Sequence, residues 1–131
     1  MKFKASLKNQ PGSHQVTLNV GEKEQTLSIA ARETGGSSIT GGELLFLALA
    51  TCYCNDIYRE AAARGIKVTG LEVEVEGDFE APGVPGTNIV YRARISGDAS
   101  EEQIRELMLH TDAIAEVQNT VRLGTPVKLE L

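Results

Sequence analysis

Apolar and polar residues alternate in the first part of the chain. Residues 2–8, 16–20 and 26–29 carry apolar side chains at every second position. This period of two predicts β-strands with one solvated face, because successive side chains of a strand point to opposite sides. Proline and glycine, which favour turns, lie between these stretches. The pattern therefore predicts an antiparallel three-strand meander.

A long helix is predicted after a glycine-rich loop. Thr40 and Glu43 have the spacing of a capping box, in which a hydroxyl and a carboxylate each satisfy a free backbone amide. The helical segment that follows ends at Gly65. Residues 44–50 are apolar on all sides, so this half of the helix is expected to be buried all round.

A second hairpin is predicted beyond the helix. Residues 68–79 and 89–95 alternate again, with acidic residues on the polar face of the first stretch and arginines on that of the second. Pairing of the two strands would bring these opposite charges together on a solvated face. A proline- and glycine-rich segment between them supplies the turn.

The C-terminal part predicts helices and a last strand. Ser100 begins a second capping box, ahead of a helix that runs through Leu109. Asp112 is expected to cap a further short helix through Val121, and the alternation in residues 127–131 predicts the last strand. This order of strands and helices is typical of the α+β class.

Length, charge and hydropathy narrow the class of protein further. The 131 residues predict a single domain, 1–131. The formal net charge of -5 argues against a nucleic-acid partner, and the longest apolar run, 44–50, is far below the roughly 20 residues that span a membrane. We therefore expect a cytoplasmic protein.

One small chain offers too little surface to cover the apolar run 44–50 on all sides, which predicts an obligate homodimer.

Two thiols, Cys52 and Cys54, lie on the predicted helix. Residues two apart on a helix are rotated by about 200°, so the two sulfurs diverge and no disulfide between them is expected. Helical spacing turns Cys52 toward a half-polar edge and Cys54 toward the core, which favours a structural role for Cys54. His14 and His110 lack zinc-site spacing, and we expect neither a metal nor another cofactor.

The sequence leaves the reactivity of Cys52 open. A buried, inert cysteine is the common case, whereas a reactive one needs a nearby cation or a helix N-terminus. Asp56 lies closer along the helix than Arg59, so the local sequence predicts a raised thiol pKa. Arg32, in the glycine-rich loop, is a second candidate cation.

The segment TGGELLFLALATCY at residues 40–53, followed by GIKV at 65–68 and an alternating strand, resembles the OsmC family, which includes the organic hydroperoxide resistance proteins. The resemblance implies an intertwined homodimer with two central helices and a thiol site at the interface. It also implies that Cys52 attacks a hydroperoxide. The family's resolving cysteine corresponds to Ala115, and Glu43 lies beside the position of the family's helix-start glutamate.

Two functions follow as hypotheses. In the first, Cys52 reduces organic hydroperoxides in oxidative stress defence as a thiol-dependent peroxidase, supported by Glu43 and Arg32, and an external thiol or dithiol resolves the sulfenic acid. In the second, the protein binds a small apolar ligand or senses oxidants through its thiol without turnover.

Overall fold

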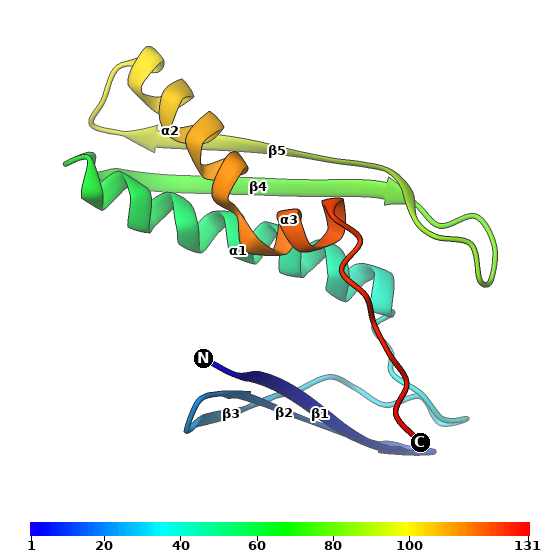
Figure 1. Ribbon diagram of the computed structural model, residues 1–131. Helices are drawn as coiled ribbons and strands as arrows, with labels where there is room; N and C mark the ends of the chain where they lie inside the picture. The colour runs from blue at the N-terminus through cyan, green and yellow to red at the C-terminus, as the bar shows by residue number, and fades with distance from the viewer. The chain divides into compact units, whose positions relative to one another are not determined.

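The structure, a computed structural model, describes residues 1–131 and contains three helices and two antiparallel sheets (Figure 1). This confirms the α+β class. The elements in chain order are β1 (Phe3–Gln10), β2 (Ser13–Val20), β3 (Lys23–Leu27), α1 (Gly41–Ala63), β4 (Val68–Asp78), β5 (Thr87–Gly97), α2 (Glu101–Ile114) and α3 (Glu116–Arg122). They form two compact units, Met1–Leu44 and Leu45–Leu131, which are described in turn. No helix is long and apolar enough to cross a membrane.

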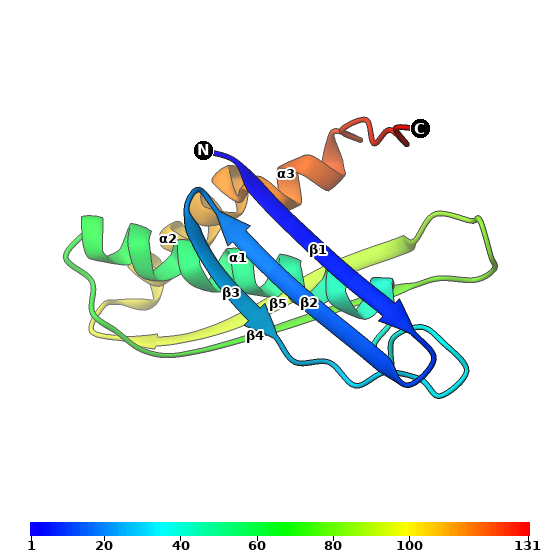
Figure 2. The same ribbon diagram turned by 90° about the horizontal axis from the view of Figure 1, so that it is seen from below.

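The first unit holds the predicted meander, with strand order β1-β2-β3 (Figure 2). Its register places apolar residues opposite one another, Phe3 against Val20 and Leu7 against Val16. This is the pairing that the alternating pattern requires, since a slip of one residue would move every apolar side chain to the other face. The meander alone does not cover its apolar face, because Phe3 and Leu7 are 70% and 65% exposed.

The predicted capping box starts α1. The Thr40 N–H and hydroxyl donate to Glu43 Oε2 at 2.7 and 2.9 Å, and the Glu43 N–H donates to the Thr40 hydroxyl at 3.2 Å. The helix ends at Ala63, where Gly65 has a φ of +67°. The Ile66 N–H then donates back to the Ala61 carbonyl at 2.9 Å. Gly65 thus adopts the left-handed backbone conformation, which favours glycine because a residue with a Cβ is strained there.

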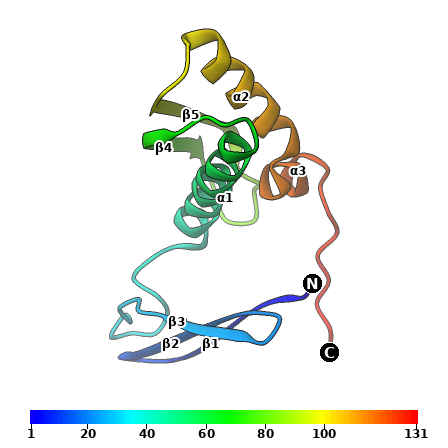
Figure 3. The same cartoon turned by 90° about the vertical axis from the view of Figure 1, so that its left-hand side faces the viewer.

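The second unit consists of the β4–β5 hairpin with α1 and α2 on one of its faces (Figure 3). Its core is formed mainly by α1 and α2 and packs against both strands; the buried members are Tyr53, Ile57, Ala61, Ile66 and Leu107. The opposite face is solvated and charged, as predicted: Arg92 pairs with Glu76 at 2.8 Å and Arg94 with Glu72 at 4.0 Å. Packing is close at Gly77, where an added Cβ would lie 2.8 Å from the Phe46 ring.

Two predicted features at the C-terminal end are wrong. Asp112 does not cap a new helix, because α2 continues to Ile114 and α3 starts after Ala115. Residues 127–131 form no strand, and Val127 and Leu129 are 96% and 86% exposed. A strand is stable only when its backbone pairs with another strand, and alternation alone does not supply that partner.

The apolar half of α1 is only partly covered by its own chain. Leu49 is buried, whereas Leu47, two residues earlier, is 58% exposed. Tyr58 on the same helix is 46% exposed. All-round burial of residues 44–50 is therefore not reached within one chain, and the predicted dimer stays a prediction that would explain this exposure.

Candidate functional site

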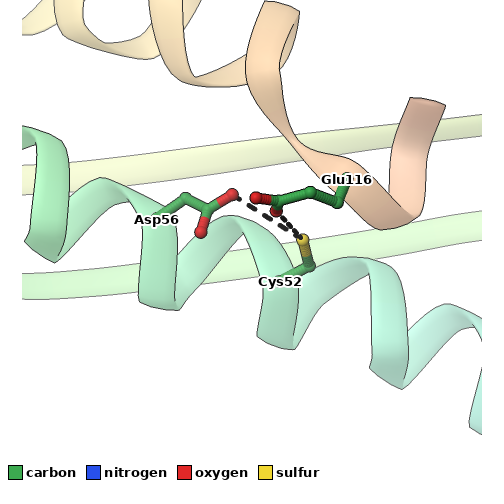
Figure 4. A group of neighbouring side chains, drawn as sticks. All are labelled: Cys52, Asp56 and Glu116. Atoms are coloured by element: carbon green, nitrogen blue, oxygen red, sulfur yellow. Dashed lines mark hydrogen bonds between the residues drawn. The ribbon is translucent and has the colours of Figure 1, made fainter. Parts of the chain in front are cut away.

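Cys52 lies where α3 meets the middle of α1 (Figure 4). Ala115, fully buried, ends α2 in an extended conformation and turns the chain into α3. The first residue of α3, Glu116, then directs its carboxylate at the thiol. The segment in which the resemblance places the resolving position is therefore adjacent to Cys52, with alanine at that position.

Two carboxylates flank the thiol. Asp56, one helical turn after Cys52 on α1, has its Oδ2 3.7 Å from the sulfur, and Glu116 Oε2 lies at the same distance of 3.7 Å. Asp56 is buried, at 4% exposed, whereas Glu116 is exposed and Cys52 is half-buried. The thiol is thus reachable from solvent beside a buried acid.

This environment opposes ionisation of Cys52. Burial raises its pKa, and the negative charges of Asp56 and Glu116 raise it further, while a backbone hydrogen bond from Val117 acts in the other direction. The net shift is upward, which confirms the prediction from the local sequence. The thiol form therefore predominates at neutral pH.

The two acids differ in their affinity for a proton. Burial, followed by the charge of Glu116, raises the pKa of Asp56. The pKa of Glu116 is lowered, chiefly by a hydrogen bond from its own backbone N–H. Arg59 contacts Asp56 Oδ1 at 2.9 Å, but it also binds Glu60 at 3.2 Å. One guanidinium is therefore shared between the carboxylates of Asp56 and Glu60.

The other predicted site residues are Cys54, Glu43 and Arg32. Cys54 is half-buried on α1, and its helical neighbours Leu47 and Tyr58 are exposed in the single chain. Hydrogen bonds from Thr40 lower the pKa of Glu43, and the charge of Arg32 adds a smaller effect. The structure thus pairs Glu43 with Arg32 electrostatically in the first unit, and their action on Cys52 stays a prediction.

The sequence reasoning missed Glu116 and Gln118, both on α3. Gln118 is 3% exposed; its side-chain amide donates to the Leu49 carbonyl at 2.9 Å, and its Oε1 has no hydrogen-bond partner. Nothing local marks either residue, since they lie more than 60 residues from Cys52 in the sequence. The one signal in the sequence is that both residues closely follow Ala115, the position that the family resemblance places at the thiol site.

The cluster of Cys52, Asp56 and Glu116 has the donor types of a metal site. One ligand atom from each residue lies within 4.8 Å of the others. The expectation of no metal rests on the positions of the cysteines and histidines alone. It does not take the carboxylates of Asp56 and Glu116 into account.

Comparison with known proteins assigns the chain to a family. Residues 34–130 match the family of OsmC-like proteins, a stretch that includes α1, Cys52 and both later helices. The chain belongs to the OsmC family. No functionally curated protein matches this OsmC-like sequence.

Solved OsmC-like structures share the fold. An OsmC-like protein from Mycoplasma pneumoniae is similar with a TM-score of 0.64 and 17% identity, over 91% of this chain and 87% of that one. An OsmC-like protein of unknown function from Vibrio cholerae gives 0.59 and 12%, over 89% and 92%. An OsmC-like hydroperoxide resistance protein from Jannaschia sp. gives 0.55 and 14%, over 97% and 86%. At these identities the likeness establishes the fold alone.

Proposed function

We propose that the protein reduces organic hydroperoxides through Cys52, as a thiol-dependent peroxidase of oxidative stress defence. The observation that carries the proposal is the contact of the Ala115–Glu116 turn with a half-buried cysteine on the central helix of an OsmC-like fold. The name of the Jannaschia neighbour, a hydroperoxide resistance protein, agrees with this chemistry.

The reaction needs one thiol in the protein and two from outside. The Cys52 thiolate attacks the outer oxygen of the hydroperoxide, the O–O bond breaks, and the leaving alkoxide takes a proton to become an alcohol. Cys52 is then a sulfenic acid. Because Ala115 offers no thiol, an external thiol condenses with it and releases water, and a second external thiol frees Cys52 and leaves as the disulfide.

The raised pKa of Cys52 adds a pH dependence to the proposal. Only the thiolate attacks the peroxide, and burial together with the two acids keeps the thiol protonated near neutrality. The rate should therefore rise as the pH increases above neutral. Asp56 is placed to accept the thiol proton, since its Oδ2 faces the sulfur at 3.7 Å.

The test is consumption of an organic hydroperoxide by reduced, chelator-treated protein with excess dithiol. Wild type and the matched control Cys54→Ser should consume peroxide, with a rate that increases from pH 7 to pH 9, and Cys52→Ser should not. A trap for sulfenic acid should label Cys52 alone. Consumption by Cys52→Ser equal to wild type, or none by wild type with any thiol, would overturn the proposal.

A thiol sensor is the second candidate, and alanine at position 115 favours it, because no thiol of the chain is there to complete a catalytic cycle. A sensor would form one sulfenic acid or mixed disulfide per chain and would not turn over in excess dithiol. The hypothesis of an apolar ligand is a third reading of the same fold.

We also infer a cytoplasmic homodimer with small thiols as reductants. A thiol that must return to its reduced state after each oxidation suits a reducing compartment. A second copy is the natural cover for the exposed Leu47 and Tyr58 on α1.

A further inference from the structure

Two of the groups that contact the Cys52 thiol belong to the first turn of α3. The Glu116 carboxylate lies 3.7 Å from the sulfur (Figure 4), and the Val117 backbone N–H donates a hydrogen bond to the sulfur. The two groups act in opposite directions, because the negative charge favours the thiol and the hydrogen bond favours the thiolate. The ionisation of Cys52 therefore depends on where α3 lies against α1.

The helix α3 does not hold this position by itself. It has seven residues, and its N-cap, Ala115, makes no side-chain capping hydrogen bond. A helix of this length is not stable in water without tertiary contacts. The Asn119 side chain donates to the Ala113 carbonyl at 3.0 Å, and Arg122 binds the Asp112 carboxylate at 2.6 Å. These bonds join α3 to α2, but they do not reach α1.

The link between α3 and α1 is made by Gln118. Its buried side-chain amide donates to the Leu49 carbonyl at 2.9 Å, and Leu49 lies three residues before Cys52 on α1. Outside the cluster of Cys52, Asp56 and Glu116, this hydrogen bond alone joins the two helices. Gln118 follows Glu116 by two residues, so the link is fixed close to the carboxylate on one helix and close to the thiol on the other.

The second polar atom of the same amide indicates that this link serves position more than stability. Gln118 Oε1 is buried without a hydrogen-bond donor, and an unpaired buried acceptor lowers stability. The Leu49 carbonyl lies inside α1, where the helix supplies it with a backbone donor of its own. An apolar side chain of similar shape would remove the unpaired oxygen and leave this carbonyl bonded. Stability therefore does not account for a glutamine at position 118.

We propose that Gln118 is a positioning residue of the Cys52 site, whose hydrogen bond to the Leu49 carbonyl keeps the first turn of α3, and with it the Glu116 carboxylate, against the thiol. Gln118 does not touch the reacting sulfur and acts through Glu116. The proposal rests on the proposed function in that Cys52 is the reacting group. Its test reads the ionisation of the thiol directly, so peroxide consumption does not decide it.

The test is a double-mutant cycle between positions 116 and 118, measured as the pH dependence of Cys52 alkylation by iodoacetamide in reduced Cys54→Ser protein. With Gln118 present, Glu116→Gln should raise the alkylation rate at neutral pH by about threefold, because it removes a charge beside the thiol. Gln118→Met has a similar shape but no amide. In this background Glu116→Gln should leave the rate almost unchanged, because the carboxylate is no longer held at the sulfur.

Asn119→Ala is the matched control, because it removes a bond of α3 to α2 and leaves the bond to Leu49 in place. In this background Glu116→Gln should keep its full effect. Gln118→Asn has an amide on a shorter side chain that does not reach Leu49, and it should behave like Gln118→Met. Circular dichroism and urea unfolding check that each variant is folded.

Four results would overturn the positioning role of Gln118. These are an equal effect of Glu116→Gln with and without Gln118, no effect of Glu116→Gln in the wild-type background, loss of its effect in Asn119→Ala as well, and loss of the fold in both Gln118 variants. Coupling between positions 116 and 118 in a protein that consumes no peroxide would support the positioning role and contradict the proposed function alone.

Discussion

The thiol of Cys52 takes its chemistry from two neighbouring acids. Burial raises its pKa first, and Asp56 and Glu116 add to the shift. Asp56 was visible in the sequence, because residues four apart on a helix are neighbours. Glu116 reaches the thiol only because α3 folds back onto α1. A cysteine in such surroundings reacts slowly as a free thiol and gains reactivity when negative charge is removed.

Glu116→Gln should lower the pKa of Cys52, because it removes one of the two negative charges beside the thiol. The measurement is the pH dependence of alkylation in a Cys54→Ser background with chelator present, so that only Cys52 reacts and no metal interferes. Glu102→Gln, an equal charge change in the first turn of α2, is the matched control. Equal alkylation profiles in the two variants would contradict the assignment.

The helices and the hairpin are joined by a polar contact in addition to the core. The Tyr91 hydroxyl on β5 donates to the Asp112 carboxylate on α2, and Arg122 on α3 donates to the same carboxylate at 2.6 Å. Tyr91 also packs edge-on against Tyr53 with ring centroids 4.9 Å apart. Asp112 therefore links three elements, α2, β5 and α3.

Tyr91→Phe should destabilise the protein at neutral pH by about 1.5–3 kcal/mol, the usual range for a hydrogen bond to a charged group. Burial raises the pKa of Asp112, but the hydrogen bonds from Tyr91 and Arg122 outweigh it and the pKa is lowered. A lowered pKa stabilises the fold above the ordinary carboxyl pKa, and this contribution is lost as the pH falls through the lowered value.

The acid side of the stability curve therefore tests the contact. Urea unfolding of Tyr91→Phe from pH 7 to pH 3 should show a smaller loss of stability on acidification than that of wild type. Thr69→Val removes a hydroxyl from an exposed residue of β4 and should leave the curve unchanged. Parallel curves for wild type and Tyr91→Phe would exclude a role of this hydrogen bond in acid sensitivity.

The whole chain leaves apolar surface that its own residues do not cover. Leu47 and Tyr58 are exposed on α1, and Val127 and Leu129 extend from an unpaired C-terminal segment. Apolar surface of this kind marks an interface in soluble proteins. A second copy, with the closed symmetry usual for such assemblies, would cover it without a further partner.

The protein should sediment at micromolar concentration with twice the chain mass of 14.1 kDa. Leu47→Glu should shift the distribution toward monomer, because it places a charge on the exposed apolar face of α1. Val84→Glu makes the same exchange in the β4–β5 loop and should leave the dimer intact. A stable, folded wild-type monomer would refute the predicted dimer.

The sequence by itself determined the elements and most of their ends. Alternation defined the meander and the β4–β5 hairpin, and the capping residues Thr40 and Ser100 marked the starts of α1 and α2. These features are local, since they depend on neighbours a few residues apart. The placement of Cys52 on the central helix and its raised pKa followed from the same local reasoning.

The tertiary structure alone decided what surrounds the thiol and which predicted strand forms. Glu116 and Gln118 join Cys52 through the turn at Ala115, a contact across more than 60 residues that leaves no periodic signal in the sequence. Residues 127–131 have the alternation of a strand but no partner within the chain. Local patterns determine what a segment is able to form, whereas long-range backbone pairing and side-chain packing determine whether it forms and what it contacts.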